Sequence, residues 1–100
     1  MTELSPARPT DPATILATLI ECLGEVLGSD VVSLMTITEQ TKAMQELGLS
    51  SLDMLRLVEA IEQYYPVAEP LVIWIAGKPV LELAQVTVGD IVEFIGDVLR

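Results

Sequence analysis

Residues 47–62, Leu-Gly-Leu-Ser-Ser-Leu-Asp-Met-Leu-Arg-Leu-Val-Glu-Ala-Ile-Glu, decide the fold, because a turn, a serine pair and an amphipathic helix follow one another without a gap. A serine directly before a helix commonly accepts a hydrogen bond from a backbone amide of the first turn. With Ser50 as this cap, Ser51 takes the first helical position beside the partial positive charge of the helix end. The segment therefore predicts a helix that begins at residue 51 and presents a serine hydroxyl at the surface.

Apolar residues recur along this helix with a spacing that the chain repeats twice more. Starting from Met54, they stand at Leu57, Val58, Ile61, Tyr64 and Tyr65. The same offsets from Leu16 give Leu19, Ile20, Leu23, Val26 and Leu27, and from Val88 they give Ile91, Val92, Ile95, Val98 and Leu99. Such offsets turn one stripe of a helix with 3.6 residues per turn towards the interior. The pattern predicts three amphipathic helices around one core, and hence an all-α domain.

Boundary signals mark the ends of these helices. Asp11 before Pro12 is typical of a cap followed by proline at the first helical position. Thr87 and Asp90 have the spacing of a capping box. The expected stops of the first and second helices are Gly28 and Pro66.

The segment between the first two helices, residues 29–49, lacks a sustained helical or alternating pattern. It predicts a long loop that is pinned to the bundle by scattered apolar residues, with a short turn of helix at Lys42–Glu46. Long loops of this kind are uncommon unless they are functional. The expected anchors are Val31, Val32, Leu34, Met35, Ile37, Met44 and Leu47.

Two structures are compatible with residues 70–83. The β-branched residues of the apolar run Leu71–Ala76 favour a strand, and a turn at Gly77-Lys78 could join a short hairpin. Pro70 and Gly77 are also helix boundary signals. An isolated hairpin is marginal and the surrounding chain is helical, so we favour a short helix at about Pro70–Ala76. Extra apolar surface here, Trp74 included, could enlarge the core or shape a pocket.

Length and composition indicate one domain. A chain of 100 residues with 51% apolar residues can build one small core. We expect a flexible N-terminal segment at residues 1–11 and a domain at 12–100. The longest apolar run is too short to span a membrane and the N-terminus lacks the features of a signal peptide, so we expect a cytoplasmic protein. Cys22 is the single cysteine, which excludes an internal disulfide and a cysteine-bound zinc.

The charge of the chain restricts its partners and its chemistry. A net charge of −10, from 15 acidic and 5 basic residues, repels nucleic acids and attracts basic protein surfaces. The chain has no histidine, the usual general base of nucleophilic catalysis. Its acidic residues are scattered over helix faces, which indicates solvated charge rather than a catalytic pair. The sequence therefore predicts no catalytic residue and no metal site.

Residues 47–62 resemble the prosthetic-group helix of acyl carrier proteins, whose pattern reads Leu-Gly-x-Asp-Ser-Leu-Asp before an amphipathic helix. The resemblance extends over residues 12–99. It implies a four-helix bundle of three long helices and one short helix, with a long loop between helices one and two. It also implies that a phosphopantetheinyl transferase moves 4′-phosphopantetheine from coenzyme A to Ser51. The chain would then hold an acyl chain as a thioester for fatty-acid, lipid or polyketide biosynthesis. It would be a carrier, not an enzyme.

The resemblance also assigns a surface. The residues of the second helix that point away from the core correspond to the face that meets partner enzymes in the family. These residues are Leu52, Leu55, Arg56, Glu59 and Glu62. We expect a monomer whose partners are the transferase and acyl-activating or acyl-transferring enzymes with basic surfaces. Two positions depart from the family, because Ser50 replaces an aspartate and Arg56 stands where an acidic residue is common.

Two other functions remain compatible with the sequence. Peptidyl carriers share the expected fold, although Gly48-Leu49-Ser50 resembles the acyl class more closely. The loss of the family aspartate at Ser50 favours a different kind of protein, an unmodified acidic helical adaptor that binds a partner through its Leu52 and Leu55 face. The mass of the protein after incubation with coenzyme A and a transferase separates the carrier from the adaptor.

Overall fold

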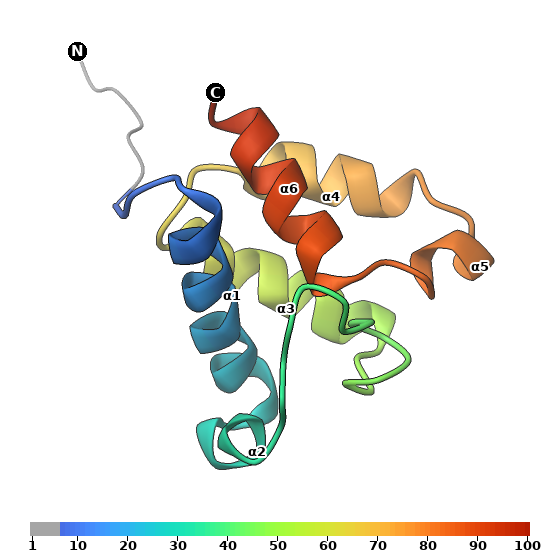
Figure 1. Ribbon diagram of the computed structural model, residues 1–100. Helices are drawn as coiled ribbons and strands as arrows, with labels where there is room; N and C mark the ends of the chain where they lie inside the picture. The colour runs from blue at the N-terminus through green and yellow to red at the C-terminus, as the bar shows by residue number, and fades with distance from the viewer. Residues whose placement is uncertain (1–6) are drawn as a thin grey trace.

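The computed structural model describes residues 7–100, which fold into helices around one core (Figure 1). The helices in this part of the chain are α1 (Pro12–Leu27), α2 (Ser29–Ser33), α3 (Ser51–Glu62), α4 (Ala68–Ala76), α5 (Val80–Leu83) and α6 (Val88–Val98). Within residues 7–100 the only strand-like pairing is one isolated bridge between Lys42 and Thr87. The predicted all-α bundle of three long helices and one short helix, α4, is confirmed, and α2 and α5 are two further short helices that were not predicted.

The helix starts form as the sequence predicts. The Asp11 side chain accepts a hydrogen bond from the Thr14 amide, and Pro12 occupies the first position of α1. Thr87 and Asp90 form a complete capping box at the start of α6. These bonds satisfy backbone amides that a helix leaves without an internal partner in its first turn.

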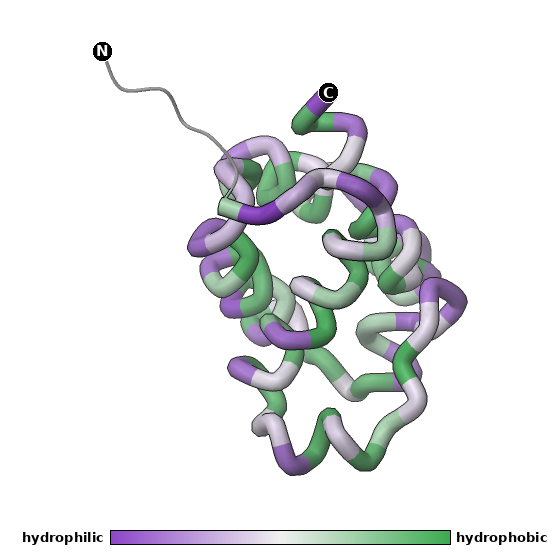
Figure 2. The backbone as a smooth tube through the Cα atoms, turned by 60° about the vertical axis from the view of Figure 1, so that its left-hand side comes forward, coloured by the Kyte–Doolittle hydropathy of each residue, from purple (hydrophilic) through white to green (hydrophobic). Residues whose placement is uncertain are grey.

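Helix α1 packs against α2, α3 and α6. Hydrophobic stretches of the helices turn towards the interior in Figure 2. The stripe predicted from Leu16 is partly wrong, because Ile15 and Cys22 are fully buried while Leu16 itself is only partly buried. Apolar residues occur on more than one side of α1, so spacing alone did not fix which side faces inward. The stripe of α3 is as predicted from Met54 to Ile61, and Tyr65 is buried beyond its end.

The helix predicted at residues 70–76 is confirmed as α4, and the hairpin alternative is wrong. The helix begins two residues earlier than expected, because the Glu62 carboxylate accepts a hydrogen bond from the Ala68 amide at 2.8 Å. Pro70 lies in the first turn, where its missing amide costs no helical bond. Trp74 stacks on Phe94 of α6 with ring centroids 4.7 Å apart. This contact joins α4 to α6, and α4 also packs against α3.

The long loop is pinned, but partly by other contacts than expected. Backbone bonds tie it to the start of α6, from Ala43 N to Val86 O at 3.1 Å and from Val88 N to Thr41 O at 2.8 Å. Among the expected anchors, Val32 and Leu47 are buried, whereas Leu34 is 89% exposed and is not an anchor. The segment expected as a loop from residue 29 begins instead with the helical turn α2.

The turn of helix predicted at Lys42–Glu46 is present only as a turn. It contains one helix-like bond, from Glu46 N to Lys42 O at 2.9 Å, and is not a helix. The bridge to α6 and this turn together lead the chain into the start of α3.

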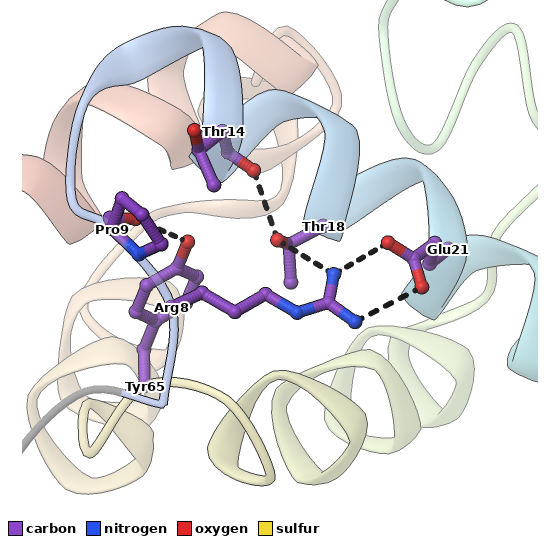
Figure 3. A network of polar contacts seen from close by, with 6 residues as sticks. All are labelled: Arg8, Pro9, Thr14, Thr18, Glu21 and Tyr65. Atoms are coloured by element: carbon purple, nitrogen blue, oxygen red, sulfur yellow. Dashed lines mark hydrogen bonds and ion pairs between the residues drawn. The ribbon is translucent and has the colours of Figure 1, made fainter.

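The segment before α1 contacts α1 and the turn that follows α3 (Figure 3). The Arg8 guanidinium binds the Glu21 carboxylate and the Thr18 hydroxyl of α1, and the Tyr65 hydroxyl donates to Pro9 O at 2.9 Å. The bond from Arg8 lowers the pKa of Glu21 below its ordinary value. Part of the segment predicted to be flexible, residues 1–6, lies outside the described residues. The boundary at residue 11 stays a prediction.

None of the helices within residues 7–100 is long and apolar enough to cross a membrane.

Candidate functional site

The two serines at the start of α3 have different positions and roles. Ser50 is the N-cap, and its Oγ accepts a hydrogen bond from the Asp53 amide at 3.1 Å. Asp53 Oδ2 accepts in return from the Ser50 amide at 3.1 Å, which completes a capping box. Ser51 is the first helical residue and is exposed. The predicted Ser50 cap is confirmed. The bond from the Ser50 amide to Asp53 was not predicted, although the Ser-x-x-Asp spacing signals a capping box.

The turn before the serine pair fixes where the helix starts. Gly48 has φ 72°, in the left-handed region that favours glycine. Leu47 and Leu49 on either side of it are both buried, while Gly48 is exposed. Two buried leucines around an exposed glycine anchor the chain immediately before it reaches Ser50 and Ser51. The hydroxyl of Ser51 is thus presented from a fixed backbone.

The surroundings of the Ser51 hydroxyl suit a phosphate ester. Within residues 7–100, neither this hydroxyl nor the amides of Ser51 and Leu52 have a hydrogen-bond partner. Amides at a helix start, together with the helix dipole, stabilise a negative group attached there. In the same part of the chain no group of three or more histidine, cysteine, aspartate or glutamate residues could hold a metal ion. The surroundings of Ser51 thus suit a covalently attached phosphate group.

Asp53, two residues after Ser51, belongs to the capping box that starts α3. Hydrogen bonds from Ser50 lower the pKa of Asp53, and the charge of Arg56 contributes in the same direction. Asp53 is therefore ionised at neutral pH and is held against the capping box. The hydrogen bonds of Asp53 are thus made with Ser50 and not with Ser51.

The predicted docking residues share one face of α3, with one qualification. Leu52 and Leu55 are 58% and 43% exposed, and Arg56 and Glu59 are exposed beside them. Their offsets of three, four and seven residues from Leu52 place them along one stripe. Glu62 is also exposed, but it lies at the far end of the helix and its carboxylate caps α4. The structure therefore brings four of the five residues together next to Ser51.

Comparisons with known proteins identify the family of this chain. The comparisons with curated proteins and with solved structures gave no match. A family model described as "Phosphopantetheine attachment site" matches residues 17–95, a range that includes the pinned loop, the serine pair and most of α6. The chain belongs to this phosphopantetheine attachment family, whose members carry covalently attached 4′-phosphopantetheine.

Proposed function

We propose that the chain is an acyl carrier protein with 4′-phosphopantetheine on Ser51, serving fatty-acid, lipid or polyketide biosynthesis. The observation that carries this proposal is the exposed hydroxyl of Ser51 at the first position of a helix whose cap is supplied by Ser50. Carrier domains of this family are not themselves catalytic. When bound, the prosthetic group supplies a terminal thiol that holds an acyl chain as a thioester.

The residues around Ser51 take separate roles in this proposal. The unpartnered amides of Ser51 and Leu52 stabilise the phosphate of the attached group. Carrier domains interact with transferases and acyl-handling enzymes. We assign this contact to the docking face, defined by Leu52, Leu55, Arg56, Glu59 and Glu62. Its two leucines are the apolar centre and its charged residues are the rim.

The cargo distinguishes an acyl carrier from a peptidyl carrier. The experiment isolates the protein from the cells that produce it and measures its intact mass before and after treatment with neutral hydroxylamine, which cleaves thioesters. We expect a hydroxylamine-sensitive addition whose mass fits a fatty or ketoacyl chain. An aminoacyl addition would show a peptidyl carrier instead. A protein with no prosthetic group, and no modification by several transferases, would be the unmodified adaptor.

The serine at position 50 should influence how fast Ser51 is modified. Ser50→Asp restores the residue found in the resembled family pattern and retains a good N-cap, so the fold should not change. We expect a higher kcat/KM of modification by broad-specificity transferases, measured with saturating coenzyme A. Circular dichroism controls for the fold. An unchanged or lower kcat/KM across several transferases would show that Ser50 suits the specificity of the protein's own transferase.

The only protein thiol should not interfere with the thiol of the prosthetic group. Cys22 is fully buried, and burial raises the pKa of its thiol to about 12, with Glu25 and Glu21 adding to the effect. The reactive species is the thiolate, which is scarce several pH units below that value. At pH 8 we expect no fast reaction of the native unmodified chain with a disulfide reagent, and one thiol after unfolding. The modified native protein should show one fast thiol, and a fast thiol before modification would contradict this assignment.

A further inference from the structure

Two carboxylates, one on the docking face and one beside it, accept hydrogen bonds that hold helix starts. Asp53 accepts a hydrogen bond from the Ser50 amide, and Glu62 accepts one from the Ala68 amide that begins α4. A partner that drew either carboxylate away would remove a helix cap, which costs about 1 kcal/mol. Of the acids along this stripe, Glu59 is the one without such a bond among the described residues.

Arg56, the cation of the docking face, does not hold a helix start. The Arg56 side chain is 61% exposed, and its closest carboxylate oxygen, Asp53 Oδ1, is 3.9 Å away, at the limit of an ion pair. An exposed pair of this length contributes little. By contrast, Arg100 binds Asp97 at 3.0 Å and Arg8 binds Glu21. Within residues 7–100, Arg56 is therefore the arginine whose charge remains available to another molecule.

Arg56 also stands where a protein acting on Ser51 must cover it. It lies five residues after Ser51, about 7.5 Å along the helix axis, and it shares a stripe with the exposed leucines at positions 52 and 55. It also borders a shallow groove of about 280 Å³ between α1 and α3, whose acidic lining residues are Glu25 and Glu59. A specific protein contact covers about 800 Å² on each partner. A contact centred on Ser51 therefore includes this guanidinium.

We propose that the natural partners of this chain place a carboxylate opposite Arg56 and an apolar pocket over Leu52 and Leu55. This rests on the proposed function, because it concerns the proteins that reach Ser51. A guanidinium covered by a partner without a carboxylate would lose its water without compensation. The net charge of −10 still favours a basic contact surface, so the carboxylate is a single acidic position within it.

The test compares two charge reversals that change the net charge equally. Arg56→Glu reverses the charge on the docking face, and Arg100→Glu reverses a charge at the C-terminus, on the opposite side of the bundle from the start of α3 (Figure 1). The readout is kcat/KM for modification of Ser51 at low and high salt. The two enzymes are the phosphopantetheinyl transferase of the cells that produce the chain and a broad-specificity transferase with a basic docking surface. Arg56→Lys and Arg56→Gln separate the loss of charge from its reversal.

With the native transferase, Arg56→Glu should lower kcat/KM about fivefold relative to Arg100→Glu at low salt, the size of a surface ion pair at the upper end of its range. Arg56→Lys should restore most of the loss, and high salt should reduce the difference. With the basic broad-specificity transferase, Arg56→Glu should raise kcat/KM. Equal values for Arg56→Glu and Arg100→Glu with the native transferase would overturn the inference, as would a loss with both transferases, which would indicate damage to the fold or to the site. Failure of the wild-type chain to be modified at all would instead overturn the proposed function.

Discussion

Ser51→Ala should abolish the attachment of phosphopantetheine to this chain. Incubation of the wild-type protein with coenzyme A and a broad-specificity transferase should add one phosphopantetheine mass, and the alanine variant should show none. Ser51 is exposed at the first position of α3 and its hydroxyl makes no hydrogen bond within residues 7–100. The alanine should therefore leave the fold intact, because it removes no hydrogen bond of the described residues. Intact mass spectrometry measures the attachment, and thermal unfolding checks the fold.

Ser50→Ala is the matched control, since it removes the neighbouring hydroxyl. It should retain the mass gain and lose about 1 kcal/mol of unfolding free energy, because the Ser50 Oγ that accepts from the Asp53 amide is the N-cap of α3. The pair of variants separates a hydroxyl that stabilises the helix from one that is modified. Peptide mapping of the modified wild-type protein locates the group directly. Attachment at Ser50, or a mass gain that survives in Ser51→Ala, would contradict the assignment.

The start of α3 and its exposed serine could be predicted because their causes are local. A helix cap acts over three or four residues, so Asp11 with Pro12, and Ser50 before Ser51, can be recognised in the sequence alone. The same holds for the outward direction of Leu52 and Leu55, which follows from the stripe that α3 buries. The pattern that places the candidate site is thus contained within sixteen residues of sequence, Leu47 to Glu62.

The features that could not be predicted depend on residues far apart in the chain or on ambiguous spacing. Helix α1 carries apolar residues on several sides, and only its packing against α2, α3 and α6 selects Ile15 and Cys22 for the core. The start of α4 depends on Glu62, which caps it from the preceding helix. Backbone bonds between the loop and α6 have no side-chain signature. The sequence therefore predicted apolar anchors for the loop but not its backbone bonds to the start of α6.

Gly89→Ala should show how much this pinning contributes to stability. Gly89 is the second residue of α6, and its amide donates to Glu39 O at 2.8 Å. A Cβ built on Gly89 would lie 2.8 Å from that same oxygen and 2.9 Å from Glu39 Cβ. Contacts this short force the loop backbone to move, and forced overpacking typically costs about 1–3 kcal/mol. The gain of up to about 1 kcal/mol that alanine offers in a helix reduces this loss without cancelling the displacement.

Gly24→Ala is the control, because it makes the same chemical change in another helix. A Cβ on Gly24 would find its nearest neighbour, Ser29 Cα, at 3.6 Å, which is an ordinary contact. This variant should therefore be stabilised, by up to about 1 kcal/mol. Denaturant unfolding measures both changes, and an unchanged dependence of the unfolding free energy on denaturant shows that a shifted midpoint reports a change in stability. A Gly89→Ala protein as stable as Gly24→Ala would mean that the loop backbone moves away without a loss of unfolding free energy. In that case the loop would not be held by the bonds that the Val88 and Gly89 amides donate to Thr41 O and Glu39 O. The position of Ser51 would depend on the buried Leu47 and Leu49 instead.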